Sequence, residues 1–158
     1  MEEIRKKPMY RYLIMLTIVS AVGLQAWATL FNNFAVEVAG LDGRHVGIIQ
    51  SVREIPGFLA LLAIYVMLII KEHRLSAFSI LLLGIGLGVN GVLPTFIGLM
   101  FATLISSFGF HYYETNNQSL TMQYFNTEQA PWVFGRQYSI ASAANIGNGL
   151  FITWFHFS

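Results

Sequence analysis

The residues of this chain that could do chemistry are polar side chains set into long apolar runs. His111, Glu114 and Gln118 follow one another at spacings of three and four residues, so on a helix they share one face. An ionisable side chain at the centre of a membrane-spanning helix costs at least about 2.5–3.5 kcal/mol, and it is kept where protein or a water-filled cavity receives it. This pattern is typical of a helix that lines a polar pathway for a solute or a proton.

Two further charged residues, Arg53 and Glu54, are neighbours in another apolar run. Adjacent residues point to different faces of a helix, so each of the two needs a partner elsewhere. An alternative interpretation is that both only stabilise the outer end of their helix, and that Glu114 only extends to water at the inner interface. The candidate pathway residues are Asn32, Asn33, Arg53, Glu54, His111, Glu114, Gln118, Asn145 and Asn148.

A polar pathway that passes protons would need a carboxylate that takes up and releases a proton. A carboxylate removed from bulk water takes up a proton more readily than an exposed one. Glu114 is therefore the first candidate for this role, with His111 one turn away, and Glu54 is the second.

Patterns of enzymes and of metal sites do not occur in the sequence. The chain has no cysteine and no phosphate-binding glycine loop, and its four histidines, at positions 45, 73, 111 and 156, have no metal-ligand spacing. We therefore expect a protein that is not an enzyme and that uses neither a cofactor nor a metal.

The composition indicates the elements that must position these residues. Of the 158 residues, 55% are hydrophobic and only 11% are charged, against about 25% charged in a soluble domain. The formal net charge is +1 and lysines and arginines cluster only in the first dozen residues, which argues against nucleic acid as a partner. The sequence therefore predicts an all-α integral membrane protein whose surroundings are the lipid bilayer.

Charge-free runs and turn signals divide the chain into about five expected spans. The run 75–113 holds 39 residues without a charge, which is too long for one crossing of a core about 30 Å thick. We place its break at residues 90–94, where Asn-Gly is followed by Pro. The expected spans, within one partial transmembrane domain over residues 1–158, are 12–36, 46–70, 75–90, 95–118 and 137–157.

Basic residues near span ends predict the orientation, because they are retained in the cytoplasm. One side of the expected topology carries seven of them and the other side carries only Arg44. The seven are Arg5, Lys6, Lys7, Arg11, Lys71, Arg74 and Arg136. We therefore expect a cytoplasmic amino terminus, in the cell (inner) membrane.

Glycines in the third expected span indicate close helix packing. The span contains Gly84, Gly86, Gly88 and Gly91, of which Gly84 and Gly88 form a small-xxx-small pair, and Ala143 and Gly147 form another pair in the last span. Such pairs let two helix backbones approach each other.

In combination, these features resemble the amino-terminal half of a major facilitator superfamily transporter. They are the polar end of the first span at Asn32 and Asn33, the stretch VGIIQSVREIPGFLA over residues 46–60, the short basic loop after it, and a polar fourth span. The superfamily has twelve spans in two halves, so the resemblance implies a chain that stops after the fifth span and lacks its carboxyl-terminal half as a partner.

The resemblance implies secondary active transport of a small solute by alternating access, in which the proton is a candidate coupling ion. The competing hypothesis is a membrane-embedded structural or accessory subunit that does not transport.

Overall fold

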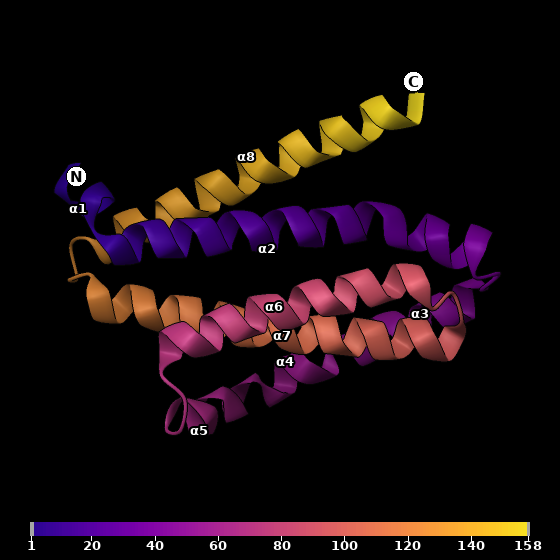
Figure 1. The fold of residues 1–158 in the computed structure, drawn as a ribbon, viewed down its shortest axis with the longest axis horizontal. Helices are drawn as coiled ribbons and strands as arrows, with labels where there is room; N and C mark the ends of the chain where they lie inside the picture. The colour runs from indigo at the N-terminus through magenta and orange to yellow at the C-terminus, as the bar shows by residue number, and fades with distance from the viewer. Residues whose placement is uncertain (1, 158) are drawn as a thin grey trace. The chain divides into compact units, whose positions relative to one another are not determined.

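The computed structural model describes residues 2–157, and every regular element among them is a helix (Figure 1). The main elements in chain order are α1 (Glu2–Lys6), α2 (Pro8–Asn33), the π-helical turn η1 (Phe34–Val38), α3 (Gly43–Arg53), α4 (Ile55–Leu59), the 3₁₀ turn η2 (Ala60–Leu62), α5 (Ala63–Met67), α6 (Glu72–Val92), α7 (Phe96–Tyr124) and α8 (Ala130–Phe157). The expected all-helical fold class is confirmed.

Four helical segments are long and apolar enough to cross a membrane, which supports the membrane assignment. They are Pro8–Val38, Gly43–Met67, Glu72–Val92 and Phe96–Tyr124. Helix α8 is long enough at 28 residues but is not among the four. Gln137, Asn145 and Asn148 lower its hydropathy, and the fifth span therefore stays a prediction.

The break between α6 and α7 lies at Pro94, the last residue of the predicted segment 90–94, whereas Asn90 and Gly91 still belong to α6. Helix α6 ends at Val92 and α7 begins at Phe96. Pro94 has no backbone N–H and cannot continue the ladder of α6. The Thr95 hydroxyl then accepts a hydrogen bond of 3.1 Å from the amide of Gly98, so it caps the new helix at its amino end.

Helix α3 begins with a carboxylate cap. The Asp42 side chain accepts a hydrogen bond of 2.9 Å from the amide of His45, and its Oδ1 lies 2.7 Å from the Nδ1 of the same histidine. These contacts, led by the backbone amide, lower the pKa of Asp42. The turn before the cap contains Gly40 at φ 66°, a left-handed conformation that favours glycine.

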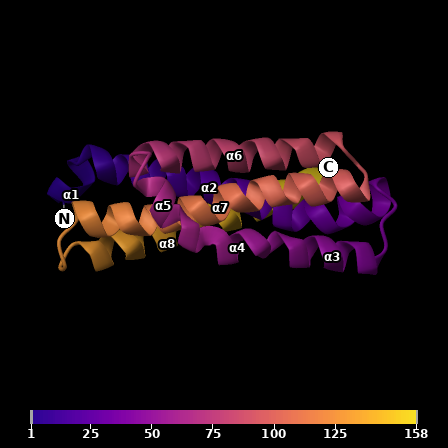
Figure 2. The ribbon, with the colours of Figure 1, turned by 90° about the horizontal axis from the view of Figure 1, so that it is seen from below.

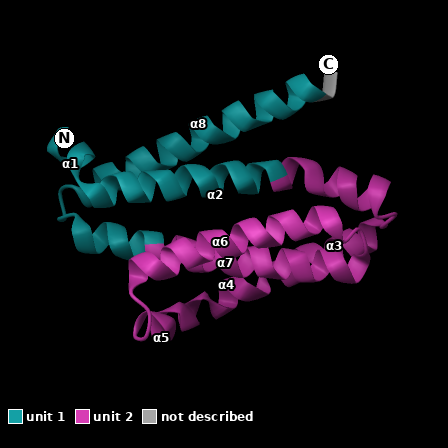
Figure 3. Ribbon diagram, viewed as in Figure 1, with its two compact units in different colours: residues 1–26, 117–158 teal, residues 27–116 magenta. Residues whose placement is uncertain are grey.

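The chain divides into two compact units, which Figure 3 shows in different colours. Unit 1 comprises residues 1–26 and 117–158, and unit 2 comprises residues 27–116. The boundaries fall within α2 and α7, so each of these helices contributes to both units.

Unit 1 is held by an apolar core between the first turns of α2, the last turns of α7 and the start of α8. The rings of Tyr10 and Trp132 stack with their centroids 5.8 Å apart. Arg5 lies over Trp132 and Lys7 lies over Phe125, each cation within 6 Å of the ring centre. The buried core residues are Ile4, Tyr10, Leu13, Leu120, Phe125, Ala130 and Val133.

Unit 2 contains a close helix pair, α6 against α7, which Figure 2 shows side by side. A Cβ added to Gly86 would lie 2.4 Å from the backbone nitrogen of Ser106, and one added to Gly109 would lie 2.4 Å from that of Leu83. Only glycine permits this approach of two backbones.

The expected close packing is confirmed at Gly86, but among the described residues it does not occur at Gly84, Gly88 or Gly147. A Cβ added to Gly84, Gly88 or Gly147 would meet nothing within 4 Å. The contact is made through Gly86, which lies on the opposite face of α6 from Gly84 and Gly88.

Candidate functional site

The candidate site in unit 2 is a break in the second membrane-spanning segment, between α3 and α4. Pro56 follows the end of α3 and has no backbone donor. The amide of Gly57 donates to the Glu54 carbonyl at 3.0 Å, a bond over three residues instead of four. The carbonyl of Arg53 consequently loses its regular partner in the helix.

Helix α7 provides the replacement partner. The hydroxyl of Ser107 donates a hydrogen bond to the Arg53 carbonyl oxygen, and Ser107 itself is only 4% exposed. Irregular backbone inside a membrane is tolerated where protein satisfies its polar groups. Helix α7 therefore stabilises the break by satisfying its free carbonyl.

One turn further along α7, His111 packs against the same break. A Cβ added to Gly57 would lie 3.1 Å from the Cε1 and 3.2 Å from the Nε2 of the imidazole. His111 is half-buried in this position. Glycine at position 57 is what gives the ring its room.

The guanidinium of Arg53 lies on an aromatic face. Its Cζ is 4.6 Å from the ring centroid of Trp27, and its Nη1 is 3.5 Å from the Gln50 Oε1. The indole N–H of Trp27 is buried and has no hydrogen-bond acceptor within the described chain. No carboxylate of residues 2–157 forms an ion pair with Arg53.

The structure thus brings two of the predicted pathway residues, Arg53 and His111, to one break. Glu54 lies at the break as well, but its side chain is exposed. Asn32, Asn33 and Glu114 also belong to unit 2, and all three are exposed.

The other three predicted residues belong to unit 1 and form no part of the break. Gln118 is exposed. Asn148 donates to the Val22 carbonyl at 3.0 Å, which links α8 to α2 within this unit. Asn145 is half-buried, and its side-chain oxygen has no partner within the described residues.

A polar network in unit 1 was not predicted from the sequence. Asn117 donates to the Gln137 Oε1 at 2.9 Å, and Gln137 donates to the Thr121 hydroxyl at 3.2 Å. The Thr121 hydroxyl in turn donates to the Asn117 carbonyl at 2.7 Å. The spacing of four between Asn117 and Thr121 is the signal that could have indicated a shared polar face on α7.

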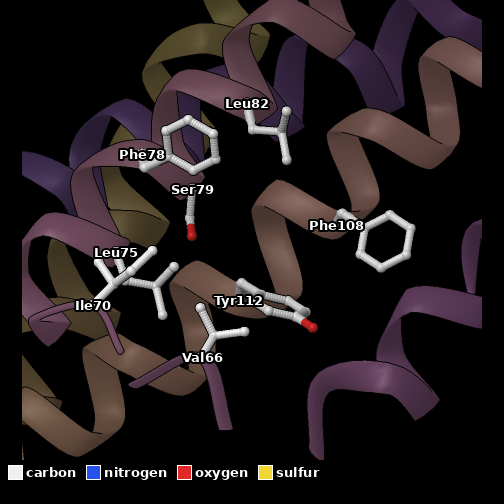
Figure 4. Close-up of a pocket in the computed structure, with 8 residues that line it drawn as sticks. All are labelled: Val66, Ile70, Leu75, Phe78, Ser79, Leu82, Phe108 and Tyr112. Atoms are coloured by element: carbon white, nitrogen blue, oxygen red, sulfur yellow. The ribbon is translucent and has the colours of Figure 1, made fainter. Parts of the chain in front are cut away.

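Unit 2 also has an apolar pocket of about 260 Å³ between α5, α6 and α7 (Figure 4). Only Ser79 and Tyr112 contribute polar groups to it, and the Tyr112 hydroxyl lies 3.5 Å from the Leu59 carbonyl. The pocket suits a hydrocarbon group and offers little to a polar solute. Its lining residues are Val66, Ile70, Leu75, Phe78, Ser79, Leu82, Phe108 and Tyr112.

No group of three His, Asp or Glu side chains in the described part of the chain could hold a metal ion. The arrangement at the break offers hydrogen-bond donors and a cation. Comparisons of the chain with models of protein families, with curated proteins and with solved structures find no match.

Proposed function

We propose that the chain is part of a secondary active transporter that moves a small polar solute across the membrane by alternating access. The observation that carries the proposal is the break at Pro56 and Gly57, which places a half-buried cation, Arg53, and a half-buried imidazole, His111, in unit 2. Gly/Pro-interrupted spanning segments form the binding sites of many transporters.

The finer parts of the proposal rest on the sequence. They comprise five spans, a cytoplasmic amino terminus in the inner membrane, and a major-facilitator-like half that works with a second half of the same transporter. The excess of basic residues on one side of the expected topology supports the orientation. Glu114 is the proposed proton carrier.

The second candidate function is a non-transporting accessory subunit. The open face of α6 at Gly84 and Gly88 favours it, because a small-residue face that meets nothing among residues 2–157 is suited to a helix of another protein.

Uptake in cells tests the two candidates. Cells that lack the gene are complemented with the complete gene, and uptake of radiolabelled succinate, phosphate, glucose and alanine is measured. We expect saturable uptake of at least one solute, its loss in Arg53→Gln and its retention in the control Arg44→Gln, which removes an exposed charge of the same unit. Equal uptake of every solute with and without the gene would favour the accessory subunit.

A further inference from the structure

We propose that Arg53 and Trp27 form a binding site for the oxyanion group, carboxylate or phosphate, of a small solute. This inference rests on the proposed transport function and names the substrate class. It is carried by the placement of the guanidinium and by the polar atoms around it that have no partner.

The first observation that supports the site is the charge of Arg53, which is unpaired within the described chain. The residue is half-buried within a membrane-spanning segment, where a cation is costly unless an anion or water neutralises it. No carboxylate among residues 2–157 lies within ion-pair distance of it. Its neighbour Glu54 is exposed and follows directly in sequence, so the two side chains leave the helix on different faces. The chain therefore provides the cation without its counter-ion.

The second observation is that most N–H donors of the Arg53 guanidinium are free to bind a ligand. The guanidinium of Arg53 lies over the ring of Trp27, with 4.6 Å between Cζ and the ring centroid. A guanidinium that contacts an aromatic ring through its π face can still offer its N–H donors to other partners. Gln50 engages only Nη1, at 3.5 Å. The remaining donors form the planar fork that binds a carboxylate or a phosphate through two parallel hydrogen bonds.

The third observation is the indole N–H of Trp27, which is unsatisfied among residues 2–157. Its N–H is buried and donates to no acceptor in the described part of the chain, and an unsatisfied buried donor costs about 1–3 kcal/mol. The same ring also stacks on Phe31, with 4.5 Å between the centroids. A ligand oxygen would thus find a donor on a ring whose position is fixed.

The depth of the site favours a solute over a lipid headgroup. Arg53 is the last residue of α3, which starts at Gly43, so it lies about 15 Å along the helix from the start of the spanning segment. That distance is about half the thickness of a hydrocarbon core. Lipid phosphates lie outside the core.

Fluorescence of Trp27 tests the site directly. Replacing Trp132 and Trp154 by Phe leaves Trp27 as the only tryptophan. The purified protein in detergent is titrated with succinate and with inorganic phosphate, and with the neutral succinamide and sodium chloride as controls at equal ionic strength. We expect a saturable change in Trp27 emission with at least one of the two oxyanions and none with either control. The responding oxyanion identifies the group.

Variants separate the site from general charge effects. Arg53→Gln is expected to abolish the response. Arg53→Lys, which keeps the charge but lacks the planar fork, is expected to weaken it about tenfold. Arg44→Gln is expected to leave it unchanged. An unaltered response in Arg53→Gln, or no response to either oxyanion in a protein with native circular dichroism, would overturn the proposal.

A titration with lipid distinguishes a solute from a lipid headgroup as the source of the oxyanion. A response to added phosphatidylglycerol without a response to succinate or phosphate would overturn the assignment to a solute. The binding assay is also independent of flux. Uptake of a neutral solute without oxyanion binding leaves transport standing and refutes this inference, whereas oxyanion binding without any uptake leaves the site standing and refutes transport.

Discussion

The hydroxyl of Ser107 donates a hydrogen bond to the main-chain carbonyl of Arg53, and so ties α7 to the point where the second spanning segment breaks. Pro56 and Gly57 interrupt the helical ladder there, and a carbonyl without a partner in hydrocarbon would be costly. The bond therefore fixes the backbone that carries the guanidinium of Arg53.

Ser107→Ala should destabilise unit 2, because it leaves the Arg53 carbonyl without a donor. The expected loss is about 1–3 kcal/mol, measured by unfolding in SDS and followed by circular dichroism. Ser51→Ala is the control: its hydroxyl is exposed and bonds to Gly47 of its own helix, so we expect little change. Equal effects of the two substitutions would argue against a special role of Ser107.

Gly86→Ala should separate α6 from α7. The added Cβ would stand 2.4 Å from the backbone nitrogen of Ser106, which cannot yield as a flexible side chain would. We expect a loss of about 1–3 kcal/mol in the same unfolding assay. Gly84→Ala, two residues away with open space around it, should be neutral or stabilise by up to about 1 kcal/mol. The reverse order of the two variants would refute the packing described for α6.

The helix cap that Asp42 provides should depend on pH. Its pKa is lowered, mainly by the hydrogen bond from the His45 amide, so the cap is fully formed above the unfolded-state pKa and is lost as pH falls through the lowered value. A carbon-13 NMR titration of the carboxyl group should give a midpoint below the ordinary one for aspartate. Asp42→Asn should keep the cap and remove this pH dependence. A midpoint at or above the ordinary value would contradict the contact.

Cysteine labelling should report the orientation, and the native chain has no cysteine to interfere. A cysteine at Asp42 is expected to react with an impermeant reagent added outside intact cells, and a cysteine at Glu72 is not. The reason is the excess of basic residues on the side of Glu72. Labelling at position 72 alone would reverse the proposed topology.

Glu114→Gln should uncouple transport from protons. If Glu114 carries the proton, the variant loses uptake driven by a pH gradient but keeps solute exchange, since exchange does not require release of the proton. Vesicles from cells expressing the complete gene provide both measurements. The control is Glu128→Gln, which removes an exposed acid between α7 and α8. Full gradient-driven accumulation in Glu114→Gln would show that Glu114 does not carry the proton, and would favour the alternative that its side chain only extends to water at the inner interface.

The helical class and most of the break points follow from the sequence in physical terms. Low charge and long apolar runs predict membrane helices, and Pro94 predicts the gap between α6 and α7, which spans residues 93–95, although the Asn-Gly turn signal lies inside α6. The sequence does not predict that the first span continues through a π-helical turn to Val38, because the pattern of apolar residues does not distinguish π from α hydrogen bonding.

Which residues meet across helices was harder to predict. Gly84, Gly86 and Gly88 alternate between two faces of α6, and one helix alone does not reveal which face its neighbour covers. Ser107 is one of several serines and threonines in α7, and a hydroxyl in an apolar run can bond to its own helix as readily as to another. Arg53 and His111 stood out because a charge or an imidazole in such a run requires an explanation.

The long separation in sequence between the break and its support has a consequence during synthesis. Ser107 follows Arg53 by 54 residues, which a ribosome adds in about 3 to 11 s at 5–20 residues per second. During that interval the chain up to Arg53 has been made, while the part of α7 that satisfies the free carbonyl of Arg53 has not. Maturation of this segment therefore completes only after α7 arrives, so a ribosome stalled before Ser107 would hold an element that cellular quality control can still recognise as unfinished.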